Sequence, residues 1–192
     1  KYPITRFAPM IFQIQEGVQI FDRQICLPNS PAPNYIFLMS LNSKSVYGDA
    51  GYGSFQTNLE NIKEAYLSLD QRKIPEGGYN CADRDGLIRV YADYKEICRQ
   101  LMNGRQNTVS YDMFSSSYGV LAFSTDRYLG SHRDMSYNKT NERVTSLGRA
   151  GNLTLHLRLN NAETVATTIM LVAVYNNTIN LNAGLIASCD YA

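Results

Sequence analysis

The segment from Gly151 to Tyr175 constrains the fold most, because it holds two apolar stretches of different kinds. In the first stretch, leucines occupy every second position from Leu153 to Leu159, with polar residues between them, which is typical of a strand buried on one side. The second, Thr167 to Tyr175, is rich in β-branched residues and apolar at consecutive positions, as expected of a strand covered on both faces. Its nine-residue length with asparagines on both flanks favours a strand over a helix. We therefore expect a second apolar sheet face that another domain or another subunit covers.

Further segments with the length and composition of strands are spread along the chain. They span residues 4–14, 18–21, 35–41, 62–69, 118–124 and 178–182, with a last short apolar segment at 184–191. Pro9 predicts an edge position or a bulge, and three prolines at 28–33 predict a stiff extended loop. Residues 70–73 read as a hairpin turn, 76–78 as the start of another loop, and Asn176-Asn177 as a turn.

One helix is predicted between Asp85 and Met102, where apolar residues recur three and four positions apart. Asp83 or Asp85 is expected to cap its first turn, and Asn103-Gly104 to end it. The spacing of the two aspartates before Gly86 also occurs in calcium loops. However, the following positions are Leu, Ile and Arg, and no glutamate arrives in register, so helix capping is the favoured reading.

Together these elements predict an all-β fold, a two-sheet antiparallel jelly-roll sandwich of about eight strands with one inserted helix at about 85–102. The 192 residues suit a single domain, residues 1–192. Two polar stretches, 42–58 and 127–149, are expected to form long loops. The glycines at 48–54 could cradle a phosphate, but no Lys-Ser/Thr and no helix follow them, which argues against such a site.

The composition excludes several classes of partner. A net charge of +1 provides no electrostatic basis for direct nucleic-acid binding, and no apolar run of about 18 residues indicates a membrane span. No signal peptide is expected at the start. The four cysteines, Cys26, Cys81, Cys98 and Cys189, lack CxxC spacing and nearby histidines, so we expect reduced thiols and no metal site.

Catalytic chemistry is not indicated either. His156 lies between leucines on the polar side of a strand, where a structural role is expected. His132 has Ser131 and Asp134 beside it, but residues so close in sequence cannot aim at one another as a triad does. Cys189 has no feature that marks it as a nucleophile. We therefore predict no enzyme and no catalytic, cofactor-binding or metal-binding residues.

The strand patterns resemble a known family. The sequence from Gly151 to Leu159, then Glu163-Thr164-Val165 and the strand ending at Tyr175, is similar to the end of the major capsid proteins of Polinton (Maverick) elements and related virophage-like DNA viruses. Residues 65–70 with Ile74-Pro75, and 118–124 before a polar stretch, occupy similar places in that family. The resemblance covers most of the chain, and its motifs are strand patterns with few diagnostic residues.

The resemblance implies a structural function. Members of the family carry two jelly rolls in one polypeptide, and three copies form a pseudo-hexagonal trimeric capsomer of an icosahedral shell. This chain resembles the second, C-terminal jelly roll, so we expect a virion protein, assembled inside the host cell, with neighbouring capsid proteins and possibly a second jelly-roll half as partners. A fragment, a cleavage product and a free-standing jelly roll all remain open, and Lys1 in place of an initiator Met fits the first two.

Two functions remain open from the sequence. In the first, strands with two apolar faces are covered by the inserted helix and loop on one side and by a neighbouring roll on the other, and the loops at 42–58 and 127–149 contact other subunits. In the second, the chain is a free-standing binding module for a glycan or a host receptor, with the tyrosine-rich segment 47–55 as its platform.

Overall fold

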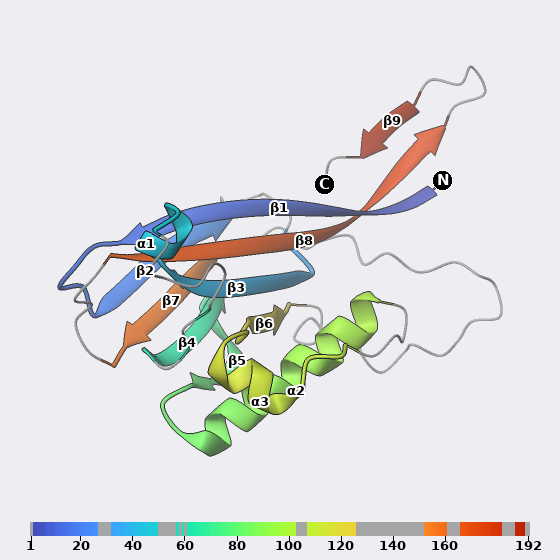
Figure 1. Ribbon diagram of the computed structural model, residues 1–192. Helices are drawn as coiled ribbons and strands as arrows, with labels where there is room; N and C mark the ends of the chain where they lie inside the picture. The colour runs from blue at the N-terminus through green and yellow to red at the C-terminus, as the bar shows by residue number, and fades with distance from the viewer. Residues whose placement is uncertain are drawn as a thin grey trace.

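The structure of the protein is a computed structural model that describes residues 2–26, 32–49, 57, 59, 61–102, 107–125, 152–160, 166–181 and 187–190. Within these residues the strands form two antiparallel sheets (Figure 1). Sheet A has the order β1 (Tyr2–Ile14), β8 (Thr167–Leu181), β3 (Tyr35–Asn42) and β6 (Leu121–Ser124), with β9 (Ala187–Asp190) also paired to β8. Sheet B has the order β2 (Ile20–Cys26), β7 (Leu153–Leu159), β4 (Ile62–Leu69) and β5 (Arg72–Asn80).

The pairing of these strands is that of a jelly roll. β1 pairs with β8, β2 with β7, β3 with β6 and β4 with β5, so the first half of the chain runs antiparallel to the second half. Two further ladders, β3 with β8 and β4 with β7, join these pairs into the two sheets. A long double ribbon wrapped into a sandwich has this connectivity. The predicted all-β two-sheet jelly roll is therefore confirmed.

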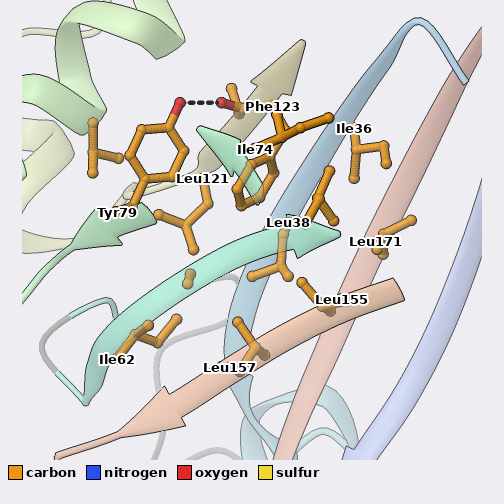
Figure 2. Close-up of a cluster of buried hydrophobic side chains, with 14 of the residues drawn as sticks. Ile36, Leu38, Ile62, Ile74, Tyr79, Leu121, Phe123, Leu155, Leu157 and Leu171 are labelled. Atoms are coloured by element: carbon orange, nitrogen blue, oxygen red, sulfur yellow. Dashed lines mark hydrogen bonds between the residues drawn. The ribbon is translucent and has the colours of Figure 1, made fainter. Parts of the chain in front are cut away.

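The core lies between the two sheets, and the predicted leucine strand contributes one of its rows of side chains. The four leucines of β7 are buried, while the residues between them are half-buried or exposed. Leu155 and Leu157 point across the sandwich toward Leu38 and Leu171 of sheet A, as Figure 2 shows. Complete burial of one such side chain contributes about 1.5–3 kcal/mol to folding. The period-two pattern in the sequence thus determines which face of β7 enters the core.

The inserted helix is confirmed as α2 (Arg84–Leu101), and a second, shorter helix, α3 (Tyr111–Ser116), follows it. The Asp83 side chain accepts a hydrogen bond from the backbone N–H of Gly86 at 2.6 Å, so Asp83 is the N-cap, as capping rather than calcium binding requires. The apolar stripe of α2 is buried through Val90, Tyr94, Ile97 and Cys98. Both helices lie at the β6 end of sheet A, away from β1 (Figure 1). None of the helices in the described parts of the chain is long and apolar enough to cross a membrane.

Some predicted boundaries are wrong. The turn predicted at Asn176-Asn177 is absent, because these residues pair with Thr5 and Ile4 of β1, and β8 continues to Leu181. The predicted loop at 76–78 lies within β5, where the register jumps from Tyr79 to Ile74 against β4. Asparagine and glycine favour turns locally, but a ladder with a neighbouring strand outweighs that preference.

Other predictions differ in detail. The strand predicted at 118–124 begins only at Leu121, and α3 was not foreseen. The loop predicted at 42–58 starts with a short helix, α1 (Ser43–Val46), capped by Asn42. The hairpin turn at 70–73 is confirmed, with positive φ angles at Asp70 (46°) and Gln71 (71°). The loop at 127–149 and the helix stop at Asn103-Gly104 lie outside the described residues.

Candidate assembly surface

The outward side of sheet A is apolar across three adjacent strands. In β1, Phe7, Pro9 and Ile11 point away from the core, because the alternate residues Ala8, Met10 and Phe12 pack against it. Directly opposite these three residues on β8 lie Val174, Val172 and Met170. The same three β8 residues lie opposite Tyr35, Phe37 and Met39 of β3. We call this set of nine residues the apolar outer face.

Exposure increases across the apolar outer face toward the edge of the sheet. Val174 is fully buried, whereas Met170, Val172 and the three β3 residues are half-buried. On β1, the strand at the edge, Phe7 is 56% exposed and Ile11 is 60% exposed. Pro9 lies between them, which confirms the predicted edge position.

Charged side chains are absent from the described outward positions of these three strands. Above and below the apolar outer face, β1 presents Thr5 and Gln13, and β8 presents Thr168 and Asn176. A contiguous uncharged apolar surface with large exposed side chains is typical of an interaction site. The strand predicted to be apolar on both faces, Thr167 to Tyr175, lies at the centre of it.

The outward side of sheet B is different, because polar side chains form a row across its four strands. Asp22 of β2 lies 2.7 Å from His156 of β7, measured between Oδ1 and Nδ1. The His156 ring stacks on Tyr66 of β4, with the ring centroids 4.6 Å apart. Lys73 of β5 lies over the same Tyr66 ring, with its Nζ atom 4.0 Å from the ring centroid. The Lys73 Nζ atom also forms an ion pair with Glu64 of β4, at 2.5 Å from Oε1. This face resembles an ordinary solvated sheet surface.

Helix α2 covers only one end of the sandwich. The helix packs against β5 and β6. It also contacts the outer side of sheet A through Gln100, whose Oε1 accepts a hydrogen bond from the Tyr35 hydroxyl at 3.4 Å. The inserted helix thus reaches the apolar outer face at Tyr35, and the expectation that it covers one side of the strands with two apolar faces stays a prediction. The β1 side of the apolar outer face lies at the opposite end of the sheet (Figure 1).

The residues weighed for catalysis do not come together in the described part of the chain. His156 lies on the polar side of β7, as predicted, with a carboxylate and an aromatic ring as neighbours. Ser131, His132 and Asp134 lie outside the described residues, and so does the side chain of Cys189. Across the described ranges, no three His, Cys, Asp or Glu side chains are grouped so that they could hold a metal ion.

Two of the four cysteines have described side chains, and both are buried free thiols. Burial, and to a smaller extent the negative charge of Asp83, raises the pKa of the Cys81 thiol to about 12. Cys98 is buried in the apolar stripe of α2. A thiol with so high a pKa is a poor nucleophile, because the thiolate is the reactive form.

Sequence reasoning identified β8 as a strand with two apolar faces but did not identify β1 as the exposed part of the surface. The signal was present, since residues 7–12 are apolar at every position. A strand with apolar side chains at both odd and even positions presents an apolar face to each side.

Comparisons with known proteins agree with this fold. Neither the protein-family models nor the curated proteins include a match to the sequence. Among solved structures, a chain from the cryo-EM structure of the Sputnik virophage is similar over 100% of this chain, with a TM-score of 0.57 and 15% sequence identity. This similarity confirms the jelly-roll fold that the resemblance to virophage-like capsid proteins implies.

Two further solved structures match over 100% of this chain. One is a chain of the PBCV-1 virus capsid (TM-score 0.41, 10% identity), and the other is PBCV-1 VP54 fitted into a reconstruction of Sputnik (TM-score 0.45, 14% identity). This chain spans 39% of the Sputnik chain and 52% of each of the other two, so it corresponds to about half, or less, of the chains it matches.

Proposed function

We propose that this chain is a structural jelly roll of a viral capsid protein, and that it assembles by burying the apolar outer face of sheet A. The observation that carries the proposal is the exposed apolar surface at the edge strand β1, where Phe7 and Ile11 are both more than half exposed. Exposing large apolar side chains to water is unfavourable, and association that buries them contributes about 25 cal/mol of favourable free energy per Å² of apolar area.

The two sides of the sandwich support this assignment by their contrast. The polar row on sheet B can face water, whereas the uncharged outer side of sheet A cannot be hydrated as well. An obligate interface of the kind found in shells buries on the order of 2,000 Å² or more and is rich in apolar side chains. The fold shared with part of the Sputnik virophage chain is consistent with this role.

We further propose that residues 1–192 form one domain of a double jelly-roll protein, with a second roll seated on the apolar outer face. Three such proteins then form a pseudo-hexagonal capsomer of an icosahedral shell, assembled in the host cell and retained in the virion. Support for a missing second roll is that this chain spans only 39% of the Sputnik chain. Contacts from the loops at 42–58 and 127–149 complete the capsomer in this proposal.

Light scattering coupled to size-exclusion chromatography tests the proposal directly. We expect a stable trimer or larger particles, which electron microscopy should show as capsomers or shells. A chain that stays monomeric at high concentration would contradict the assembly proposal.

The alternative, a glycan- or receptor-binding module, is favoured by one feature of the surface. Tyr47, which follows α1, is 72% exposed, and its hydroxyl accepts a hydrogen bond from Gln13 on β1. A fixed exposed ring of this kind can stack on a sugar. The alternative predicts a monomer that binds glycans on an array and loses binding when Tyr47 is replaced by alanine.

A further inference from the structure

Strand β1 forms one edge of sheet A, and the side of it that lies away from β8 is here called the open edge. All 13 residues from Tyr2 to Ile14 lie opposite β8 in one unbroken register. No strand in the described part of the chain pairs with the open edge. A long edge strand presents a row of unpaired N–H and C=O groups, which is a template for pairing with a strand of another chain.

The hydrogen bonds of β8 show which residues of β1 face the open edge. The carbonyl oxygen of Val174 accepts a bond from the backbone N–H of Asn34 at 2.8 Å, and the backbone N–H of Asn176 donates to the Asn34 side chain at 2.9 Å. Asn34 directly precedes β3, so the even-numbered residues of β8 direct their backbone groups toward β3. Backbone groups alternate in direction along an antiparallel strand, so the odd-numbered residues of β8 bond to β1. They lie opposite the even-numbered residues of β1, which leaves the odd-numbered ones facing the open edge.

Both prolines of β1 fall at odd-numbered positions, so both missing N–H groups lie on the open edge. Pro3 lies opposite Thr178, and Pro9 lies opposite Val172. At an even-numbered position either proline would remove a hydrogen bond of the ladder with β8. Within sheets, proline is found at edge-strand positions of this outward-facing kind.

The prolines divide the open edge into short pieces. Its remaining N–H donors are those of Thr5 and Phe7 and, beyond Pro9, those of Ile11 and Gln13. A strand added along this edge would meet no more than two donors before the next interruption. Edge strands are otherwise protected by charged side chains or bulges. The described edge has neither, because no charged residue stands at these positions and the register with β8 does not shift.

We infer that Pro9 and Pro3 block strand addition at the open edge of β1, so that a second jelly roll meets sheet A on the apolar outer face, with one sheet packed on the other. Packing of two sheets face to face depends on interdigitating side chains and needs no hydrogen bonds between their backbones. Pro9 thus acts twice, because its ring belongs to the apolar outer face and its missing N–H interrupts the edge. The face-to-face contact rests on the proposed function, whereas the blocked edge does not.

Two substitutions at Pro9 in the 192-residue chain test the blocked edge. Pro9→Val and Pro9→Thr both restore the N–H group, but only valine keeps this position apolar. We expect electron microscopy to show elongated assemblies of both variants, because a continuous edge can pair with the edge of a second copy. Thr5→Val is the matched control, since it adds a β-branched apolar side chain at the same edge without adding a donor. It should form no elongated assemblies.

Hydrogen–deuterium exchange measures the edge directly, also in the unmodified chain. At concentrations where that chain associates, we expect the N–H groups of Phe7 and Ile11 to exchange rapidly. In the assembled Pro9 variants they should exchange at least about tenfold more slowly, because pairing protects them. Circular dichroism verifies that each variant is folded.

Two results would overturn the inference. One is slow exchange at Phe7 and Ile11 in associated unmodified chain, which would show that the edge pairs despite Pro9. The other is a pair of folded Pro9 variants that neither elongate nor gain protection. An unmodified chain that is monomeric at every concentration contradicts the proposed function and the face-to-face contact, whereas elongated assemblies of the Pro9 variants would still support the blocked edge.

Discussion

Ile11 and Met170 lie directly opposite each other in the β1–β8 ladder, and both side chains point away from the core. Cross-strand apolar pairs of this kind normally stabilise a buried sheet face. Here the pair lies on an outward face, with Ile11 60% exposed, so the stabilisation it offers is completed only when another surface covers it. This pair forms one end of the apolar outer face, on its exposed β1 side.

The first prediction concerns this face. In the 192-residue chain by itself, whose apolar outer face no second roll covers, Ile11→Asp should weaken self-association at least about tenfold. A buried carboxylate without a partner costs several kcal/mol, and each 1.4 kcal/mol is a factor of ten. Ile20→Asp is the matched control, since Ile20 is similarly exposed at 66% but lies on β2 of sheet B. Analytical ultracentrifugation measures both, and equal effects of the two substitutions would count against the apolar outer face.

The second prediction concerns the core. Leu155→Ala should lower the free energy of unfolding by about 2–5 kcal/mol, because a fully buried leucine is replaced in a close-packed interior. Thr154→Ala, on the other side of the same strand, should change it by less than about 1 kcal/mol. Urea titrations measure both values, and a small effect of Leu155→Ala would mean that β7 does not hold the core together.

The third prediction concerns the start of α2. Alanine normally stabilises a helix by about 1 kcal/mol relative to glycine. At Gly86, however, an added Cβ would lie 1.9 Å from the backbone oxygen of Asn80. Gly86→Ala should therefore destabilise the protein by about 1–3 kcal/mol or more, as forced overpacking does.

The control for this substitution is Gly77→Ala. A Cβ at Gly77 would meet only the Arg89 side chain at 3.5 Å, an ordinary contact. Thermal unfolding followed by circular dichroism compares the two variants. A melting temperature for Gly86→Ala at or above that of the unmodified chain would show that α2 does not approach β5 as closely as described.

The fourth prediction concerns Cys81. Its pKa is raised from 9.0 to about 12, mainly by burial, so at about pH 8 the thiolate fraction in the folded state is about a thousandfold lower than in the unfolded state. A thiol reagent should label Cys81 only after denaturation with urea. Peptide mapping by mass spectrometry identifies the labelled residue, and rapid labelling in the native state would contradict the burial.

The fifth prediction concerns alkaline pH. Burial is also the main cause that raises the pKa of Tyr94 to about 12, and both groups are neutral when protonated. The folded chain therefore retains these protons at a pH where the unfolded chain has released them. The contribution of the two groups to the free energy of unfolding is fully present below about pH 9 and is lost as the pH rises toward 12. Cys81→Ala should flatten part of this decline, whereas an unchanged slope would remove Cys81 as a contributor.

Much of the fold was predictable because its signals are local in the sequence. The alternating leucines of β7, the helical stripe of α2 and the N-cap Asp83 each depend on residues only a few positions apart. For the same reason the errors occurred where local preference and long-range pairing disagree. Asn176 favours a turn by itself, yet it pairs with Thr5, a residue far away in sequence.

The sequence by itself determined that the chain is an all-β sandwich and that some strands are apolar on both faces, because side-chain periodicity follows directly from the order of residues. Only the tertiary structure decided where that second face lies and how much of it remains exposed. Phe7, Val174 and Tyr35 become neighbours through the register of three strands, and exposure depends on which segments lie above them. Register and coverage depend on contacts between distant parts of the chain, which no local pattern contains.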